Sequence, residues 1–536
     1  VSSFTCRRYL LRKRNSMRGK EESVTTEKRP RVYTAPAEEV PATDFELTVD
    51  GQPAFTHAAR VSARPVNAFF RDWQRPLDET EIASFAGWEM SATLEVRARS
   101  NRPVESVRVR PASAGITPRV KGGEISFTVE KPGQYTLEVN DARNVLHLFA
   151  YPPEEDSPDP DDPDVLHFGP GVHCAGIIRP HDGQTIYIAA GAVVYGAILA
   201  EKARDIAIRG RGILDGSRFP RECLTGLVCL YDCRNVRIEG ITLRDAPVFN
   251  VVPLACRDVH IRNIKLIGSW RYNTDGVDFG NCRDCSLEDS FLRTFDDSVC
   301  IKGYEYFGPW VFRMRMAGED HRGHIFRIDD VEGAYTELQR HFATYACPPD
   351  VCDHIRVRRC VIWCDWGKSL EIGARTQADE IHEVLFEDCD VIRHNGGSIM
   401  SIQNMDRARC HDIVFRDIRV ELDDGPQRPV IVKSRDEPCG KPAAGYLPKL
   451  ISLSNRAGYY SADSRRGRIE DVRFENISVT APRMPDSRLA GFDADSLVQR
   501  VTVENLTLNG RPLTNLEDAG IQLNDFTRDV MIREPR

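Results

Sequence analysis

Three aspartates in the middle of the chain could carry out acid–base chemistry if the fold brings them together. Asp275 lies in the motif Asn-Thr-Asp-Gly, and the adjacent pair Asp296 and Asp297 begins 21 residues later. Like charges held close together raise the pKa of at least one carboxyl group, so one aspartate would be protonated beside ionised neighbours. A protonated acid beside a carboxylate base is the combination that hydrolysis of a glycosidic bond requires.

A repeated phrase supplies the elements that would position these aspartates. Its first copies begin at Cys233, Cys256 and Cys282 and read Cys-Arg-Asn/Asp, followed by short β-type runs; similar copies continue to residue 508. A period of between twenty and thirty residues without helical spacing is typical of a solenoid. Two short strands flanking a polar kink form one coil of a parallel β-helix. The 21-residue spacing is close to one coil, so the three aspartates should lie on one face of adjacent coils.

A single aspartate at a coil turn has a simpler interpretation, which is that it caps backbone N–H groups. We expect that role for Asp258 and Asp412. For three acids framed by Asn273, Gly276 and Lys302, catalysis is the favoured interpretation, with Asn273 and Lys302 expected to bind substrate.

These residues resemble glycoside hydrolase family 28, the polygalacturonases and rhamnogalacturonases, and are similar to the dextranase and isopullulanase family, glycoside hydrolase family 49. The resemblance covers roughly residues 165–510, and its specific part is Asn-Thr-Asp followed by the aspartate pair and Ile-Lys-Gly. It implies an all-β, right-handed parallel β-helix and hydrolysis with inversion. It also implies that Asp296 is the general acid and that Asp275 and Asp297 position and activate water.

The chain departs from the pectinolytic members of that family in two places. Residues 365–373 lack the histidine of their Gly-His-Gly motif, and residues 398–404 lack the Arg-x-Lys pair that binds a uronate carboxylate. A cationic fork is the natural partner of a carboxylate, so we expect a neutral glycan or a side-chain sugar instead of polygalacturonate. Further candidates for sugar binding are Trp270, Trp366, Glu371 and Arg375. The tryptophans, with Trp363, could stack on sugars or belong to the core.

Composition divides the chain before the repeats. Residues 41–152 carry short alternating runs between Pro-Gly and Gly-Gly turns, which predicts a small antiparallel β-sandwich. Residues 153–164 are acidic and Pro-rich, as expected of an extended linker; a metal site is the less favoured interpretation. Residues 1–40 begin with a basic stretch and are expected to form a disordered tail, with a transit peptide or a nucleic-acid arm as alternatives. The catalytic β-helix is expected over residues 165–536.

The longest break in the repeat, residues 304–350, directly follows the aspartate pair. We expect this insertion to fold beside the site as a wall that favours exo action. Its His321 and His324 could help to bind substrate or could simply be surface residues.

The chain has 16 cysteines, and the repeat accounts for many of them. Cys233, Cys256 and Cys282 occupy equivalent positions, as do Cys360 and Cys389, so we expect ladders of buried thiols. Disulfides in an exported protein are the alternative. Zinc is the less favoured interpretation of the Cys-x-x-Cys spacing, because alternate residues of a strand face opposite ways.

Charge and hydropathy exclude several classes of partner. With 72 Lys and Arg against 80 Asp and Glu the net charge is −8, so we expect no nucleic acid. No run of 18 apolar residues exists, so we expect no membrane span.

We expect a carbohydrate substrate and neither a cofactor nor a metal. The sequence does not predict the oligomeric state. The missing apolar stretch of a signal peptide favours the cytoplasm, although secretion stays open.

Two other functions fit the same architecture. A polysaccharide lyase would need a Lys or Arg base and commonly calcium, and the missing uronate-binding pair argues against it. A non-catalytic glycan-binding solenoid would explain the repeats but has no need for three clustered carboxylates.

Overall fold

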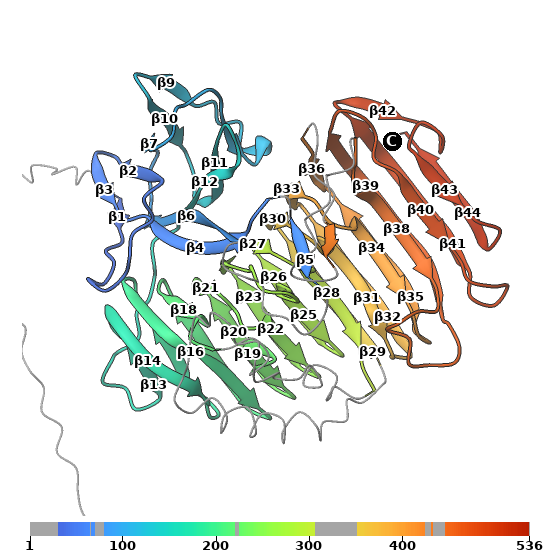
Figure 1. The fold of residues 1–536 in the computed structure, drawn as a ribbon. Helices are drawn as coiled ribbons and strands as arrows, with labels where there is room; N and C mark the ends of the chain where they lie inside the picture. Colours follow the sequence, from blue (N-terminus) through green and yellow to red (C-terminus); the bar gives the residue numbers. More distant parts are fainter. Residues whose placement is uncertain are drawn as a thin grey trace, which may run out of the picture.

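The computed structural model describes residues 30–64, 66–69, 80–219, 224–305, 351–423, 430–432 and 445–534. These residues form a β-sandwich followed by a long stack of β-coils (Figure 1). The predicted all-β architecture, a parallel β-helix preceded by a small sandwich, is confirmed.

The sandwich consists of two sheets. One contains β1 (Arg31–Val32), β4 (His57–Ser62), β6 (Thr80–Glu89), β8 (Val107–Arg110), β11 (Gly133–Val139) and β12 (Asp141–Tyr151). The other contains β2 (Phe45–Val49), β3 (Gln52–Ala54), β7 (Leu94–Ser100), β9 (Arg119–Lys121) and β10 (Glu124–Val129). Strand β7 alternates buried and exposed residues along its length, which places its apolar side chains against the core shared with the other sheet.

The structure bears on two of the predicted segments before the β-helix. Strand β1 pairs with β6 although it lies within residues 1–40, so the part of the expected tail from residue 30 onwards is ordered in the sandwich; residues 1–29 lie outside the described residues. The acidic segment 153–164 contains no strand, as expected of a linker. It is nevertheless anchored to the first coils, because Glu154 accepts a hydrogen bond from Tyr187 at 2.8 Å.

The β-helix winds through three faces, which we call sheets 1, 2 and 3. Sheet 1 contains β13 (Val165–Phe168), β15 (Thr185–Ile188), β17 (Arg204–Gly210), β20 (Arg234–Glu239), β23 (Arg257–Arg262), β26 (Arg283–Glu288), β29 (Val351–Arg358), β32 (Glu380–Glu387), β35 (Arg409–Arg416), β39 (Arg468–Thr480), β41 (Val498–Leu508) and β44 (Thr527–Arg533). Sheet 2 contains β14 (Gly171–Ile178), β16 (Ala192–Glu201), β18 (Ile213–Asp215), β21 (Thr242–Arg244), β24 (Lys265–Ile267), β27 (Phe291–Thr294), β30 (Val361–Cys364), β33 (Asp390–His394) and β36 (Arg419–Glu421). Sheet 3 contains β19 (Gly226–Tyr231), β22 (Phe249–Leu254), β25 (Val277–Gly280), β28 (Val299–Gly303), β31 (Leu370–Thr376), β34 (Ser398–Asn404), β38 (Lys449–Asn455), β40 (Ser487–Ala490) and β43 (Ile521–Leu523).

Three further strands lie outside these faces. The short β42 (Arg511–Leu513) pairs antiparallel with β41 near the end of the chain. A separate two-stranded sheet joins β5 (Asn67–Phe69), which follows the β4 strand of the sandwich, to β37 (Val430–Val432), which follows a strand of sheet 2.

The polar residues of the repeated phrase turn the chain between faces. Asn235, Asp258 and Asp284 have φ angles of 52°, 55° and 55°, a left-handed conformation that Asn and Asp tolerate better than most residues. Asp412 has the same conformation, at φ 53°. The expected capping role of Asp258 and Asp412 is therefore better described as a backbone requirement at the corner.

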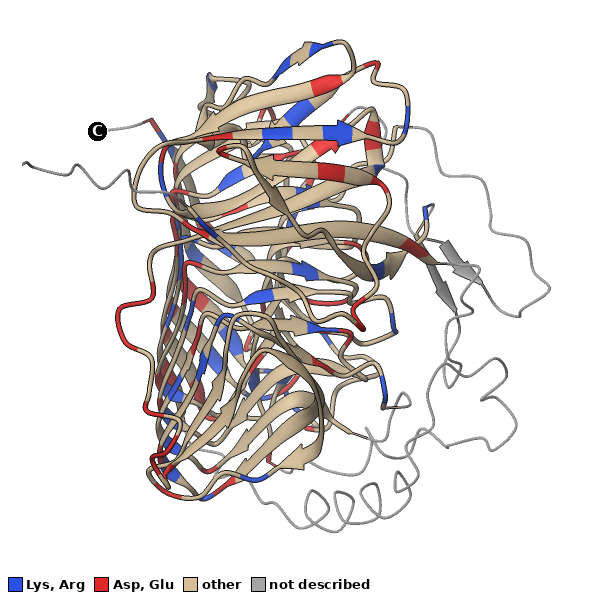
Figure 2. Cartoon of the chain, turned by 90° about the vertical axis from the view of Figure 1, so that its left-hand side faces the viewer, with Lys and Arg blue, Asp and Glu red and all other residues tan. Residues whose placement is uncertain are grey.

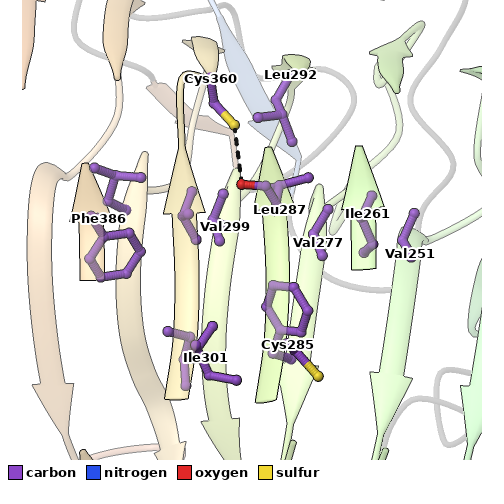
Figure 3. Close-up of a cluster of buried hydrophobic side chains, with 14 of the residues drawn as sticks. Val251, Ile261, Val277, Cys285, Leu287, Leu292, Val299, Ile301, Cys360 and Phe386 are labelled. Atoms are coloured by element: carbon purple, nitrogen blue, oxygen red, sulfur yellow. Dashed lines mark hydrogen bonds between the residues drawn. The ribbon is translucent and has the colours of Figure 1, made fainter. Parts of the chain in front are cut away.

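Between the corners, apolar side chains point into the coil and stack on those of the next coil. Ile261 pairs with Leu287, and Val277 with Val299, in register across the parallel strands. Figure 3 shows these side chains filling the interior, and all four are fully buried. Stacking of equivalent residues gives one continuous core along the solenoid.

The cysteines of the phrase are part of this core. Cys233, Cys256 and Cys282 are fully buried, and the Cys233 backbone N–H donates to the Cys256 sulfur at 3.4 Å. Cys360 and Cys389 are buried in the same way. Every cysteine in the described part of the chain is a free thiol. The burial of these five cysteines and the contact between Cys233 and Cys256 fit the expected ladder.

The sandwich packs against the outer surface of sheet 2. Phe149 and Tyr151 of β12 belong to an apolar cluster with Phe291 and Trp363 of the β-helix. Arg110, only 1% exposed, adds ion pairs to Glu421 at 2.7 Å and Asp423 at 2.6 Å. Sheet 2 is thus covered, which fixes the sandwich beside the turns that leave that sheet.

On the face shown in Figure 2, basic and acidic residues are interspersed over strands and turns. Elsewhere among the described residues, pairs between neighbouring coils include Arg416 with Glu475 at 2.7 Å and Arg419 with Asp390 at 2.7 Å. In the described ranges, the fold contains no helix that is long and apolar enough to cross a bilayer.

The insertion expected at residues 304–350 is described only for Tyr304 and Glu305. Residues 306–350, including His321 and His324, lie outside the described residues.

Candidate active site

The three aspartates lie in the turns that lead from sheet 2 to sheet 3. Asp275 precedes β25, and Asp296 and Asp297 precede β28 on the next coil. The Gly276 N–H donates to the Asp297 carbonyl oxygen at 2.8 Å, which locks the two turns side by side. The structure therefore brings the predicted acids together.

Asp297 is held as an anion by a neighbouring turn. Its Oδ1 accepts the backbone N–H of Lys368 at 2.7 Å, and the Lys368 ammonium lies 3.6 Å from the same oxygen. The Cys300 thiol donates to Oδ2 at 3.4 Å. Burial opposes ionisation of Asp297, but Lys368 and Lys302 outweigh it and lower its pKa below the ordinary value of an aspartate.

Asp296 has the opposite character although it is the next residue. It is half-buried, its Oδ1 accepts the Asp297 N–H at 3.1 Å, and its Oδ2 accepts from Asn273 at 3.4 Å. Burial and the negative charge of Asp297 raise the pKa of Asp296 to about 7. Asp296 is thus protonated in mildly acidic solution, where Asp297 is ionised.

Asp275 is buried deeper, at 4% exposed, beside Lys302. The ammonium of Lys302 lies 3.1 Å from Asp275 and 2.6 Å from Asp278. Burial and the nearby charges of Asp278, Asp296 and Asp297 raise the pKa of Asp275, and Lys302 only partly opposes them. A carboxylate oxygen of Asp275 and one of Asp297 lie within 4.8 Å of each other, which suits two groups that hold one water molecule.

Atoms of the same residues are also candidate metal ligands. One ligand atom from each of Asp275, Asp297 and Cys300 lies within 4.8 Å of the others, and no second group of this kind occurs among the described residues. The Lys302 ammonium beside Asp275 already supplies the positive charge that a cation would bring. The thiol of Cys300 has a raised pKa, because of burial and the charge of Asp297, and so is a poor ligand.

Of the three tryptophans considered for sugar binding, two lie in the core and one lies beside the acids. Trp270 is fully buried, and its indole N–H donates to Asp245 at 2.7 Å, so its expected contact with sugar is wrong and it belongs to the core. Trp363 is likewise fully buried. Trp366 is half-buried and stacks on Phe295 with ring centroids 6.2 Å apart, at the edge of the Asp296 turn.

The other two candidates lie behind and beside the acids. Glu371 is fully buried and forms an ion pair with Lys368 at 3.3 Å, so it acts on the site through that lysine and does not contact sugar as expected. Burial raises the pKa of Glu371 to about 7. Arg375 is half-buried and donates to the Tyr460 carbonyl oxygen at 3.2 Å.

Two residues of the site were not singled out from the sequence. Lys368 is the one cation in residues 365–373, the segment that lacks the histidine of the Gly-His-Gly motif, and its charge is the signal that marks it. Tyr460 lies in a turn outside the repeated phrase, and its hydroxyl pKa is raised by burial and by the charge of Asp296. No sequence pattern marks it, because its place depends on the path of a loop.

Comparison with known proteins identifies the same region of the chain. The sequence profile of glycosyl hydrolases family 28 matches residues 218–310, which contain all three aspartates. The resemblance predicted from the motifs is thus confirmed over that segment.

Individual relatives match over short stretches. A probable polygalacturonase from Vitis vinifera is 31% identical over 84 residues, which is 15% of this chain and 17% of that protein. A polygalacturonase from Arabidopsis thaliana is 26% identical over 118 residues, 19% of this chain and 27% of that protein. The chain thus matches less than a third of the length of either relative.

The structural similarity covers a much larger share of the chain than the sequence matches do. Dex49A from Penicillium minioluteum superposes with a TM-score of 0.61 over 94% of this chain and 96% of its own, at 13% identity. At that identity the match establishes a shared fold, including both the sandwich and the β-helix, and nothing finer.

Proposed function

We propose that this protein is a glycoside hydrolase that cleaves polysaccharide or oligosaccharide by an inverting mechanism. The observation that carries the proposal is the pair Asp296 and Asp297, adjacent in sequence but opposite in pKa. A carboxylic acid beside a carboxylate is what acid-assisted cleavage of a glycosidic bond requires.

In the proposed reaction, Asp296 donates its proton to the glycosidic oxygen as the bond to the anomeric carbon breaks. Asp297 accepts a proton from the water that attacks the anomeric carbon from the opposite side. The raised pKa of Asp275 makes it better suited to orient this water than to deprotonate it. A single displacement by water inverts the configuration of that carbon.

We further propose that the substrate is neutral at the cleaved position. Both lysines near the acids already lie beside acidic side chains of the protein itself, Lys302 between Asp275 and Asp278 and Lys368 beside Asp297. Strand β34 (Ser398–Asn404) carries no cation where a uronate-binding pair would be expected. A cation that is already neutralised contributes little to binding a sugar carboxylate.

The test is the release of reducing ends from a panel of neutral glycans of different sugars and linkages and from polygalacturonate by the wild type, by Asp296→Asn and by Asp258→Asn. Asp296→Asn should lose about 10²–10⁴-fold in kcat, because it removes the proton donor. Asp258→Asn is the matched control, since Asp258 occupies a left-handed corner of sheet 1 that Asn also tolerates.

Hydrolysis by Asp296→Asn at the wild-type rate would contradict the role of Asp296. A wild type that cleaves polygalacturonate faster than every neutral glycan would overturn the proposed substrate class. A wild type that releases no reducing ends from any of them would contradict the function.

A further inference from the structure

One side chain of the sandwich reaches the turn that holds Asp297. Arg64 follows β4 (His57–Ser62), and its backbone N–H donates to Glu81 of β6 at 3.2 Å, which ties it to the sandwich. Its guanidinium donates to Asp365 of the β-helix at 3.0 Å. The side chains are 10% and 2% exposed, so this ion pair is shielded from solvent.

Other groups complete the binding of this guanidinium. In the amide orientation that satisfies both residues, the Asn395 side-chain oxygen accepts from Arg64 at 2.8 and 3.2 Å. The guanidinium also lies over the ring of Trp363, 5.5 Å from its centroid, and the Trp363 indole donates to Asp365 at 2.9 Å. Arg64 is therefore held in one position by groups from three turns or strands of the β-helix.

Asp365 is the first residue of the turn that carries the catalytic contacts. The Trp366 N–H donates to the Phe295 carbonyl oxygen at 2.6 Å, and the Lys368 N–H donates to the Asp297 carboxylate at 2.7 Å. Between them, Gly367 packs so closely that a Cβ there would lie 2.3 Å from the Asp297 nitrogen. A shift of this turn would move both the backbone N–H and the ammonium group of Lys368, which together lower the pKa of Asp297.

A second contact from the sandwich side supports the same turn. Val66 is 1% exposed and packs in a small apolar cluster with Tyr272 and Phe295, against which Trp366 also rests. Val66 therefore touches both coils that carry the acids by apolar packing, and Arg64 touches the coil that follows them by an ion pair.

We propose that Arg64 is a positioning residue of the active site, through which the N-terminal sandwich holds residues 365–368 against Asp297. The proposal rests on the proposed function for its kinetic part. It assigns the sandwich a role in catalysis beyond covering sheet 2.

The test compares Arg64→Ala with Arg108→Ala. Arg108 also spans the two parts of the molecule, by an ion pair to Asp423 at 2.9 Å, but it is exposed and does not contact the turn. Arg64→Ala should lower kcat about 10–100-fold, as expected when a reacting group is misplaced, with a smaller change in KM. It should also move the acidic limb of the pH profile to higher pH, because Asp297 loses donors. Arg64→Lys, which keeps the charge, should recover part of the loss.

Hydrogen exchange measured by mass spectrometry gives a readout that does not need activity. Peptides covering residues 365–373 should exchange faster in Arg64→Ala than in the wild type, and should be unchanged in Arg108→Ala. Equal kinetics and equal exchange in the two alanine variants would overturn the proposal. So would faster exchange along the whole chain together with an unchanged kcat per folded molecule, because that pattern describes a purely structural residue.

The two proposals can fail separately. A wild type without glycosidase activity would contradict the proposed function, while the exchange of residues 365–373 would still decide whether Arg64 holds the turn. If Arg64→Ala does not fold, Arg64→Lys supplies the same comparison, with an intermediate increase in exchange expected.

Discussion

Adjacent aspartates acquire opposite protonation states because their neighbours differ. Asp297 receives a backbone N–H and an ammonium group from Lys368, whereas Asp296 receives only weaker donors and faces the charge of Asp297. Lys368 also neutralises the buried Glu371 behind it. The difference in pKa between the two aspartates thus depends on Lys368, a lysine from the following coil.

Replacing Lys368 by Met should raise the pKa of Asp297. Asp297 acts as the base in its ionised form, so activity appears as pH rises through its pKa, and in Lys368→Met this acidic limb should move to higher pH. Asp296 acts in its protonated form, so activity should fall as pH rises through about 7. The measurement is kcat/KM against pH for the wild type, Lys368→Met and Lys368→Arg. An acidic limb at the same pH in all three proteins would contradict the assigned role of Lys368.

At the scale of elements, much of the β-helix could be predicted because its requirements are local. Corners need residues that tolerate a left-handed backbone, which places Asn235 and Asp258 at fixed points of the phrase, and inward positions need apolar or small side chains. The neighbouring positions of Asp275 and Asp296 follow from the coil length alone. These features repeat, and repetition is visible in a single sequence.

The features that escaped prediction depend on packing between distant segments. Trp270 looked suited to a sugar surface, but its turn folds inward against Asp245. Strand β1 joins the sandwich by pairing with β6, with Arg31 opposite Glu89, and its two residues are too few to show the alternation of a strand. Lys368 reaches Asp297 across an insertion that hides the coil spacing.

The aromatic ladder of sheet 1 provides a test of coil stacking. Phe415 is fully buried between Phe386 and Phe474, with ring centroids 4.7 and 5.0 Å away. Phe415→Ala should cost about 3–5 kcal/mol of stability, and Phe415→Leu clearly less, because the cavity is smaller. Denaturant unfolding followed by circular dichroism measures both. Equal midpoints for the wild type and Phe415→Ala would show that stacking at this level contributes little.

At the scale of the whole molecule, the sandwich and the β-helix are joined by buried charges as well as by apolar packing. Arg110 of β8 forms ion pairs with Glu138 of its own sheet and with Glu421 and Asp423 of the β-helix. In the other direction, Arg393 of β33 forms an ion pair with Glu138 at 2.8 Å. Burial works against ionisation, yet Arg393 and Arg110 lower the pKa of Glu138 and lower that of Asp423 to about 2. The network fixes the sandwich beside the active site.

This network should make the junction sensitive to acid. Glu138 and Asp423 have pKa values below those of the unfolded chain, so their stabilisation is complete above a pH of about 4 and is lost as pH falls towards 2. Burial raises the pKa of Glu421, so that carboxyl contributes in the opposite direction. Arg110→Met leaves buried carboxylates unpaired and should cost about 3–5 kcal/mol near neutral pH. Thermal unfolding at neutral and acidic pH measures both effects, with the exposed Arg97→Ala as control. A melting temperature for Arg110→Met equal to the wild type at neutral pH would contradict this role.

The central claim is that Asp296 and Asp297 act together as acid and base in one displacement by water. The most direct test is to follow the first-formed anomer by NMR during hydrolysis of an oligosaccharide that the wild type cleaves. The account predicts a first product with the configuration inverted relative to the cleaved bond, and no such product from Asp296→Asn. A first product that retains the configuration would contradict it, because retention requires a carboxylate to attack the sugar before water does.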